Sequence, residues 1–391
     1  MSEARSLNGF VDSEVLDKVR VGREYVAAKF GFRNHWYPAL FSREIKEGEV
    51  KPIELLGEKI VLKRIDGRVR GIRDRCLHRG VQFSSKIECY TKDTLTCWYH
   101  GFTYRFEDGM LVNIVGAPES GVIGRRRIKT YPVQEAQGLV FVFIGDDLQP
   151  LPPLAEDVPP DFLEPDLAVR GVRSDVKANW RIGCENGFDS THIFIHRQAE
   201  LIKANDIALP LGLVPKGRSS FRSVEEAGSP KGVFDLFDPD HVTPVFEGAV
   251  EHQKVLASNP EATHKLPHHI SIWLPGVLRV HPWPDPSLTQ YEWYVPIDGD
   301  RHIYLRTLGR HIKSARELEQ FEHEFATKWC PLALEGFNAD DIWAREATEP
   351  FYRDDTGWLR EQLFEADGNI IEWRKLASRH NRGIQQPEHL R

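Results

Sequence analysis

Two short stretches constrain this chain more than any other part of it, because each sets a cysteine close to a histidine. The stretch CLHRG contains Cys76 and His78, and the stretch CWYHG contains Cys97 and His100. One thiolate and one imidazole therefore come from each of two loops. Four ligands of these two types, brought together by folding, predict a metal centre.

Two kinds of centre suit such a ligand set. If the two thiolates held one iron and the two imidazoles the other, the centre would be a Rieske two-iron, two-sulfide cluster, in which histidine raises the reduction potential. A structural zinc site also accepts two cysteines and two histidines. Zinc fingers, however, usually pair cysteine with cysteine and histidine with histidine, whereas each stretch here mixes them. The mixed pairs favour the Rieske cluster, which the nearby aromatic residues would shield from water.

Cysteine usage agrees with metal chemistry. Five cysteines in 391 residues do not make a disulfide framework, and the odd count leaves at least one thiol unpaired. A reducing compartment is therefore expected, and we predict a cytoplasmic protein. The three cysteines outside the two stretches have no histidine close by and are interpreted as small packing residues: Cys89, Cys184 and Cys330.

Charge and hydrophobicity limit the possible partners. The net charge is -7, and nucleic-acid binding needs a surplus of lysine and arginine, so no nucleic acid is expected. No window approaches the ~18 consecutive apolar residues of a membrane span, so no membrane partner is expected either. A hydrophobic content of 41% is sufficient for two ordinary cores. Small molecules or other proteins remain as partners.

The chain divides at a proline-rich segment. Residues 31–147 are rich in strand-like runs, two of which are interrupted by Asp-Gly pairs at 66–67 and 108–109, a strong hairpin signal. Residues 148–166 hold clustered prolines, which cannot donate hydrogen bonds to a sheet and disfavour helix. We therefore predict a linker there and two domains.

The second domain mixes strands and helices. Residues 268–283, 290–298 and 301–309 read as neighbouring antiparallel strands. A helix is predicted to begin after Ser314, with Glu317 at capping-box spacing. The predicted fold class is α+β, with an all-β first domain.

A second cluster of possible ligands lies in this domain. His192 and His196 are four residues apart, so on a helix both rings leave the same face and can bind one ion. A non-haem ferrous oxygenase needs one carboxylate in addition, with positions left open for dioxygen and substrate. Glu185 is a local candidate, and Asp340 and Asp341 are candidates on a later helix. Two histidines at this spacing are more often packing or surface residues than metal ligands. A Rieske cluster upstream, however, needs an electron acceptor, which favours a metal site at these two histidines.

These motifs together resemble the Rieske non-haem iron ring-hydroxylating oxygenases. The pair CLHRG and CWYHGFTYRFEDG resembles the Rieske domain of that family, and the D-x-x-H-x-x-x-H stretch resembles its catalytic motif. The resemblance implies one 2Fe-2S cluster, with Cys76 and Cys97 on one iron and His78 and His100 on the other. It also implies one mononuclear Fe(II), held by His192, His196 and Asp341, with Asp340 as the alternative carboxylate.

Asp189 receives a separate role from the resemblance. In the family, the aspartate three before the first histidine bridges that ligand to a Rieske histidine of the neighbouring subunit, here His192 to His78 or His100. A carboxylate that accepts the distal N–H would fix the ring and shorten the path of the electron. An ordinary turn or helix cap is the alternative that the text FDST also permits.

The likeness extends over nearly the whole chain, to members that dihydroxylate fused nitrogen heteroaromatics such as carbazole. It implies a homotrimer, electrons from a ferredoxin and its reductase, and two domains. These are a Rieske domain at 31–147 and a helix-grip (START-like) catalytic domain at 148–391, on which 1–30 packs. The implied substrate pocket consists of the Gly187 carbonyl, which would accept a ring N–H, and five side chains: Ile270, Leu278, Val280, Trp283 and Phe337.

Trp283 departs from the family pattern, because a phenylalanine is expected in its place, and both substrate size and regiochemistry depend on this position. A basic run, GRRRIK at 124–129, is the densest in an acidic protein. It is either solvated surface or the docking site of an acidic ferredoxin. Two further functions remain open: a monooxygenase or dioxygenase of another polycyclic compound, and a helix-grip ligand carrier with a structural zinc.

Overall fold

A computed structural model describes residues 9–189, 191–205, 207 and 268–390, together with the backbone of four short strands between them. Contacts divide the chain into two units. The β unit comprises Arg33–Pro152 with Pro387–Arg391, and the α+β unit comprises Met1–Phe32 with Pro153–Gln386. The expected ranges, 31–147 and 148–391 with 1–30, differ from these by a few residues. The last five residues group with the β unit, which the sequence did not indicate.

The β unit is built from ten strands in three small antiparallel sheets. The first contains β1 (His35–Phe41), β10 (Leu139–Ile144) and β9 (Val133–Ala136); the second β2 (Val50–Leu55), β3 (Glu58–Ile65), β4 (Arg68–Arg73) and β8 (Thr130–Tyr131); the third β5 (Thr94–Thr96), β6 (Phe102–Arg105) and β7 (Leu111–Ile114). Short 3-10 turns are Ser42–Glu44 and Phe83–Ser85.

Both Asp-Gly hairpins are confirmed. Asp66 and Gly67 join β3 to β4 with φ angles of 52° and 74°, the left-handed conformation that a two-residue hairpin turn requires. Asp108 and Gly109 lie between β6 and β7, where Asp108 Oδ1 accepts a hydrogen bond from Met110 N at 3.1 Å. The third sheet, to which the second of these turns belongs, carries one of the Cys-His stretches between β5 and β6.

A seven-stranded antiparallel sheet forms the centre of the α+β unit, in the order β11-β19-β18-β17-β16-β14-β13. Its strands are β11 (Leu167–Val176), β13 (Phe221–Ser223), β14 (Gly232–Phe237), β16 (His268–Trp273), β17 (Val277–His281), β18 (Thr289–Pro296) and β19 (His302–His311); β12 (Leu213–Pro215) pairs with β15 (Val242–Pro244) separately. The predicted run of neighbouring antiparallel strands is confirmed by β16 to β19.

The helices of this unit come from several parts of the chain. They are α1 (Ser13–Leu16), α2 (Arg23–Ala27), α3 (Trp180–Phe188), α4 (Glu200–Ala204), α6 (Ala315–Glu324), α7 (Asn338–Tyr352), α8 (Gly357–Arg360) and α9 (Gly368–His380), with a 3-10 helix η5 (His192–Gln198) and a π-helix η8 (Phe325–Phe337). The turns Leu154–Glu156, Pro160–Leu163 and Glu365–Asp367 are 3-10, as is Pro387–Leu390 of the β unit. Ser314 caps α6 as predicted, by accepting a hydrogen bond from Glu317 N. None of the described helices is long and apolar enough to cross a membrane.

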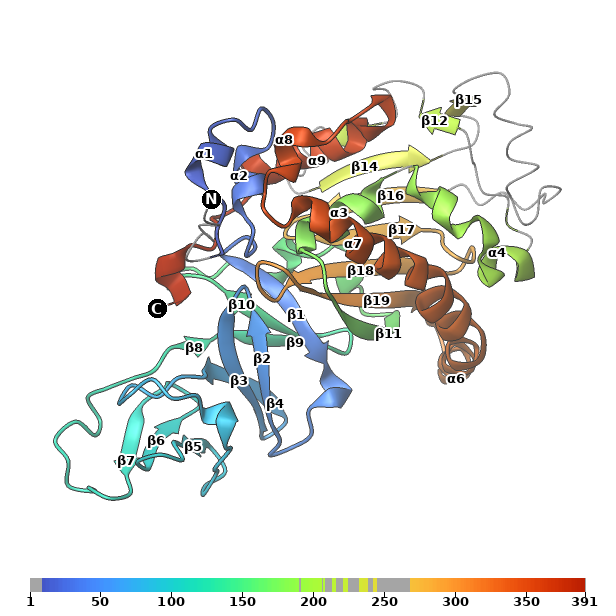
Figure 1. The fold of residues 1–391 in the computed structure, drawn as a ribbon. Coiled ribbons are helices and arrows are strands. Elements are labelled where there is room, and N and C mark those ends of the chain that lie inside the picture. Colours follow the sequence, from blue (N-terminus) through green and yellow to red (C-terminus); the bar gives the residue numbers. More distant parts are fainter. Residues whose placement is uncertain are drawn as a thin grey trace. The chain divides into compact units, whose positions relative to one another are not determined.

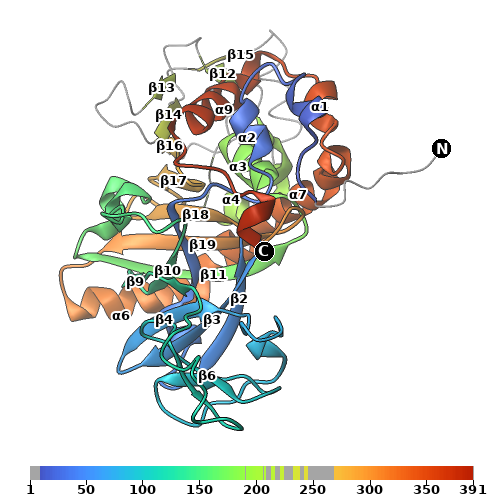
Figure 2. The ribbon, with the colours of Figure 1, turned by 90° about the vertical axis from the view of Figure 1, so that its left-hand side faces the viewer.

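Helices α3 and α7 pack together against one face of the sheet (Figure 1), and α2 lies beside α9 in both views (Figure 1, Figure 2). This arrangement confirms the predicted α+β class. It also places the end of α3 and the first turn of α7, both of which carry candidate site residues, close to β18.

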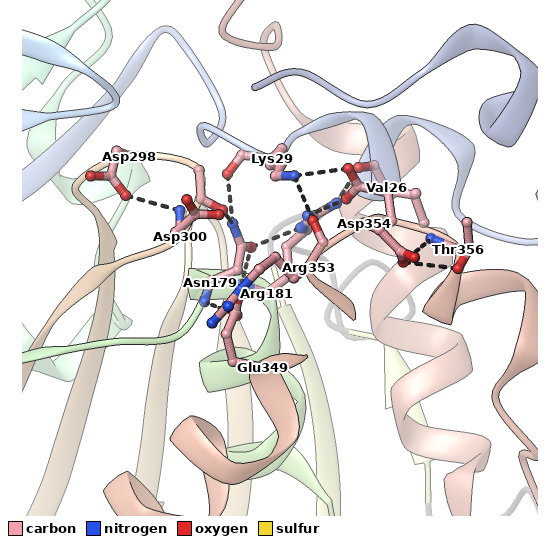
Figure 3. A network of polar contacts seen from close by, with 12 residues as sticks. Val26, Lys29, Asn179, Arg181, Asp298, Asp300, Glu349, Arg353, Asp354 and Thr356 are labelled. Atoms are coloured by element: carbon pink, nitrogen blue, oxygen red, sulfur yellow. Dashed lines mark hydrogen bonds and ion pairs between the residues drawn. The ribbon is translucent and has the colours of Figure 1, made fainter. Parts of the chain in front are cut away.

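A buried polar network fixes the other ends of these two helices (Figure 3). Asn179 caps α3. Its Nδ2 donates hydrogen bonds to Lys29 O and Gly299 O at 2.9 and 2.7 Å, and its Oδ1 accepts one from Arg181 Nε at 2.8 Å. Its backbone N donates to Glu349 Oε2, on the last turn of α7, at 2.8 Å. The N-terminal segment, α3 and α7 are therefore tied at one point, which sets the position of α7 relative to α3.

Candidate functional site

The two Cys-His stretches form turns with the same hydrogen-bond pattern. Gly80 N donates to Cys76 O, and Gly101 N donates to Cys97 O, each at 2.9 Å. Both glycines have positive φ angles, 73° and 71°, which glycine adopts without strain. Matching turns therefore present the two halves of the ligand set from β-strand ends of one unit.

Within these turns the thiols are buried and the imidazoles are exposed. Cys76 and Cys97 are 1% and 2% accessible, and the rings of His78 and His100 lie at the surface with centroids 4.5 Å apart. Tyr104 Oη lies 3.5 Å from Cys76 Sγ. Such a separation suits a two-iron cluster whose cysteine-bound iron is inside and whose histidine-bound iron is close to solvent.

The electrostatics of two of these side chains, Cys76 and His100, also fit this cluster. Burial raises the pKa of the Cys76 thiol, although the hydroxyl of Tyr104 opposes the shift. A thiolate at this depth therefore needs a bound cation. Desolvation, followed by the charges of His78 and Arg79, lowers the pKa of His100. The neutral ring is the form that binds a metal.

Two histidines and one aspartate converge in the α+β unit. His192 and His196 lie on η5, a 3-10 helix where the sequence indicated a helix of unspecified type, and their rings are 5.4 Å apart. Asp341 Oδ1 lies 3.6 Å from His192 Nε2 and 3.4 Å from His196 Nε2. One ligand atom from each residue falls within 4.8 Å of the other two. The arrangement is that of a 2-His-1-carboxylate site.

The buried atoms of this cluster lack partners of their own. Neither His196 Nε2 nor Asp341 Oδ1 has a hydrogen-bond partner among the described residues, although both are buried. Burial opposes a charged ring, but Asp341 and Asp340 raise the pKa of His196 to about 9. Burial likewise opposes the charge of Asp341, but His196 holds its pKa well below the usual range. The cluster is therefore built to hold a positive charge, which fits Fe(II).

The other two carboxylate candidates lie elsewhere. Asp340 Oδ2 is 3.3 Å from His196 Nδ1, on the opposite edge of that ring. Glu185 binds Arg374 with both oxygens, at 2.8 and 2.7 Å. Of the three candidates, Asp341 is the one whose carboxylate faces both histidines.

Asp189 makes a local turn. Its Oδ1 accepts hydrogen bonds from Thr191 N and Oγ1 at 2.7 and 2.8 Å. His192 Nδ1 contacts the backbone carbonyl of Asp189 and not its carboxylate. The backbone carbonyl thus occupies the place that the sequence interpretation gave to the carboxylate, and the role of the carboxylate between subunits stays a prediction.

One cavity is lined both by the expected pocket residues and by residues of the 2-His-1-carboxylate site. It has a volume of about 60 Å³ and is lined by all six of them, Gly187, Ile270, Leu278, Val280, Trp283 and Phe337, together with His192 and Asp341. The rings of Trp283 and Phe337 are 5.2 Å apart and narrow the space. Gly187 is needed for close packing, because a Cβ there would lie 1.9 Å from Tyr294 Oη.

Four lining residues were not found from the sequence: Ile193, Gln290, Glu292 and Asn338. Gln290 and Glu292 are polar residues two apart in the fully buried strand β18, and side chains two apart share one face. Asn338 lies three before Asp341, on the same side of α7. These spacings are signals that a search for buried polar residues could have used.

Comparison with known protein families identifies the class. Residues 35–132 match the Rieske [2Fe-2S] domain, and residues 143–385 match the homotrimeric ring hydroxylase family. The chain belongs to this family of Rieske ring-hydroxylating oxygenases. Its expected cofactors, one Rieske cluster and one mononuclear iron, are those of the class, so this prediction is confirmed.

Individual relatives are more specific. The chain is 54% identical to the terminal oxygenase component of carbazole 1,9a-dioxygenase from Sphingomonas sp., over 94% of this chain and 97% of that protein. It is 52% identical to the same component from Metapseudomonas resinovorans, over 97% and 99%. A solved carbazole 1,9a-dioxygenase oxygenase, bound to fluorene and ferredoxin and with one phenylalanine replaced by tryptophan, has a TM-score of 0.91 at 52% identity, with 97% and 99% of the two chains covered.

Proposed function

We propose that this chain is a terminal oxygenase that adds both atoms of dioxygen to a flat, fused nitrogen heteroaromatic, with carbazole as the preferred substrate. The observation that carries this proposal is the cavity, in which apolar walls meet His192 and Asp341. The two relatives above 50% identity that act on carbazole support the choice of substrate.

The residues divide the work between two sites. Cys76, Cys97, His78 and His100 would hold the Rieske cluster, and His192, His196 and Asp341 would hold the mononuclear iron. When bound, the cluster supplies electrons one at a time and the ferrous iron activates dioxygen. The apolar walls hold the rings in place and exclude water.

The product follows from the position of attack. Dihydroxylation at the angular 9a carbon and the adjacent carbon 1 consumes one dioxygen, two electrons and two protons. The resulting hemiaminal opens without a further enzyme to 2'-aminobiphenyl-2,3-diol. The Gly187 carbonyl, which belongs to the last turn of α3, would accept the ring N–H and so orient the angular carbon.

A ferredoxin, with its reductase, is the proposed electron donor. A groove on the β unit contains five cations beside the first ligand loop: Arg73, Arg75, Arg79, Arg127 and Lys129. Arg125 and Arg126 of the basic run are exposed next to it in the sequence. An acidic protein surface is the partner that such a groove attracts.

The proposed assembly is a homotrimer, in which the cluster of one subunit delivers electrons to the iron of the next through Asp189. The exposed side chains of Leu77 and Tyr99 support this, because each adjoins a histidine of the Rieske site and presents apolar surface. A cytoplasmic location belongs to the same proposal, since five cysteines in 391 residues are too few for a disulfide framework, as expected in a reducing compartment.

The decisive experiment is turnover of carbazole under ¹⁸O₂ with ferredoxin and reductase, followed by mass spectrometry. Two labelled oxygens in an aminobiphenyl-diol are expected. One labelled oxygen would indicate a monooxygenase. No product from an iron-loaded enzyme, with dibenzofuran and fluorene tried in parallel, would exclude carbazole. Analysis of iron and acid-labile sulfide distinguishes an oxygenase of any of these kinds from a ligand carrier with a structural zinc.

A further inference from the structure

Asn338 is a buried polar residue for which neither the motif nor the proposed reaction accounts. It is 1% accessible and is the first residue of α7, three positions before Asp341. Its Nδ2 lies 3.1 Å from Asp341 Oδ2. Because Oδ2 receives this hydrogen bond, Oδ1 is the oxygen of the carboxylate that faces His192 and His196.

The second hydrogen bond of Asn338 reaches a buried carboxylate on the sheet. Asn338 Nδ2 lies 3.3 Å from Glu292 Oε1, which also accepts a hydrogen bond from Gln290 Nε2 at 2.5 Å. Tyr294 and Tyr304 donate to the other oxygen, Oε2, at 2.7 and 2.6 Å. Glu292 is thus held by donors on both oxygens and serves as a fixed anchor for the amide.

These contacts determine which way the amide points. Its nitrogen faces two carboxylates, and its oxygen accepts a hydrogen bond from Gln290 Nε2 at 3.0 Å. The reverse orientation would set the amide oxygen of Asn338 against Glu292 and Asp341, with no donor between them. Asn338 therefore always offers an N–H to Asp341.

We propose that Asn338 is a positioning residue that holds Oδ2 of Asp341 in a hydrogen bond, so that Oδ1 is the oxygen presented to the iron that this centre would hold. A 2-His-1-carboxylate site functions because positions stay open for dioxygen and substrate, and a carboxylate that bound through both oxygens would occupy one of them. Hydrogen-bonded partners of metal ligands commonly change metal affinity by 10- to 100-fold when they are removed. The inference rests on the proposed iron centre and not on the identity of the substrate.

The test compares Asn338→Leu with Tyr304→Phe in the homotrimeric holoenzyme. Both variants remove a buried donor to Glu292 from the same network, but Tyr304 donates to Glu292 Oε2, whereas Asn338 also donates to Asp341. One readout is the rate at which a ferrous chelator extracts the mononuclear iron. The other is the electron paramagnetic resonance signal of the ferrous site with nitric oxide, a probe of its open position. Neither readout depends on turnover.

In Asn338→Leu, iron extraction should be about 10 to 100 times faster and the nitric oxide signal should change. Tyr304→Phe should leave the signal as in the wild type and the extraction rate within about threefold, since it removes a donor to Glu292 and not to an iron ligand. Wild-type behaviour of Asn338→Leu would overturn the inference, and so would equal effects of the two variants. If Asn338→Leu yields no folded trimer, the smaller Asn338→Ala, which also lacks the N–H, decides by the same readouts. Failure of carbazole turnover alone would bear on the proposed substrate and not on Asn338.

Discussion

Asp341 Oδ1 lies 3.4 Å from His196 Nε2, and the preceding residue lies on the other edge of the same ring, with Asp340 Oδ2 3.3 Å from His196 Nδ1. The ring is thus placed between two neighbouring carboxylates with different tasks. Asp341 faces the metal position, whereas Asp340 can only accept the hydrogen of the distal nitrogen and so orient the ring.

Replacement of each aspartate should separate these tasks. Asp341→Asn is expected to lose the mononuclear iron altogether, because an anionic ligand is replaced by a neutral one. Asp340→Asn should retain it with affinity lower by about tenfold. The measurement is the amount of mononuclear iron per Rieske cluster. Metal analysis gives the total iron, and the visible spectrum gives the amount of cluster. Loss of iron in Asp340→Asn together with full retention in Asp341→Asn would reverse the assignment.

The bridge attributed to Asp189 can be separated from its local turn. Asp189→Asn keeps an oxygen for Thr191 N and Oγ1 but removes the charge, and Asn suits such a position as well as Asp does. Both metal centres should stay loaded, while oxidation of a reduced Rieske cluster by dioxygen, in the presence of substrate, slows by about 100-fold. Stopped-flow spectroscopy of the pre-reduced enzyme measures this step.

The matched variant is Thr191→Val, which removes the hydroxyl that donates to Asp189 and leaves the carboxylate intact. It should transfer electrons at close to the wild-type rate. If Thr191→Val is as slow as Asp189→Asn, the turn and not the carboxylate explains the effect.

The parts of the molecule that sequence could predict are those fixed by local rules or by a motif. Asp66 and Gly67 make their hairpin because few other pairs tolerate positive φ at both positions. The two Cys-His turns were predicted from their spacing, and the six cavity residues from the resemblance to the family. Each of these predictions used residues that lie close together in the sequence or match a known pattern.

The rest depended on contacts between distant residues. Adjacent helical residues point about 100° apart, so the choice between Asp340 and Asp341 needed the position of α7 relative to η5. Glu185 was excluded by its pairing with Arg374, 189 residues away. The network around Glu292 joins β18, β19 and α7, and no local pattern indicates it.

Trp283 should control the size of the substrate. Its ring narrows the cavity against Phe337, so Trp283→Phe is expected to favour bulkier substrates. The ratio of kcat/KM for a four-ring compound to that for carbazole should rise by about tenfold, in the range that pocket-size changes give. Trp273→Phe is the matched control, since Trp273 is the last residue of β16, lies outside the cavity lining and donates to Ser271 Oγ at 2.9 Å. An equal rise in both variants would contradict a specific role of Trp283.

The basic run should govern ferredoxin docking. The double variant Arg125→Glu, Arg126→Glu reverses charge beside the groove that holds Arg127. We expect ferredoxin-dependent turnover to fall by about tenfold at low salt and by less at high salt, where charges are screened. Turnover with a small chemical reductant should not change. Lys46→Glu, an exposed position that does not line the groove, is the control. Unchanged ferredoxin-dependent turnover in the double variant would exclude docking at this surface.

Glu349 should make the stability of the protein depend on pH. Burial, assisted by Asp300, raises its pKa to about 6, although the hydrogen bond from Asn179 N opposes the shift. A carboxyl whose folded pKa is raised favours the folded state in its protonated form. Its contribution is therefore complete below the unfolded value of about 4.3 and is lost as the pH rises through about 6.

Glu349→Gln keeps an acceptor for Asn179 N (Figure 3). It also removes the free-energy cost of holding an ionised carboxylate at this buried position. At pH 7 to 8 the variant should be more stable by about 1 kcal/mol, after allowance for solvent screening, and near pH 4.5 the difference should vanish. Thermal unfolding midpoints across this range measure it. Glu346→Gln is the control one turn earlier on α7, where an exposed carboxylate accepts from Lys177 N at 3.0 Å. A surface change of this kind should stay within about 0.5 kcal/mol at every pH. A stabilisation of Glu349→Gln that does not depend on pH would show that packing, and not ionisation, limits this end of α7.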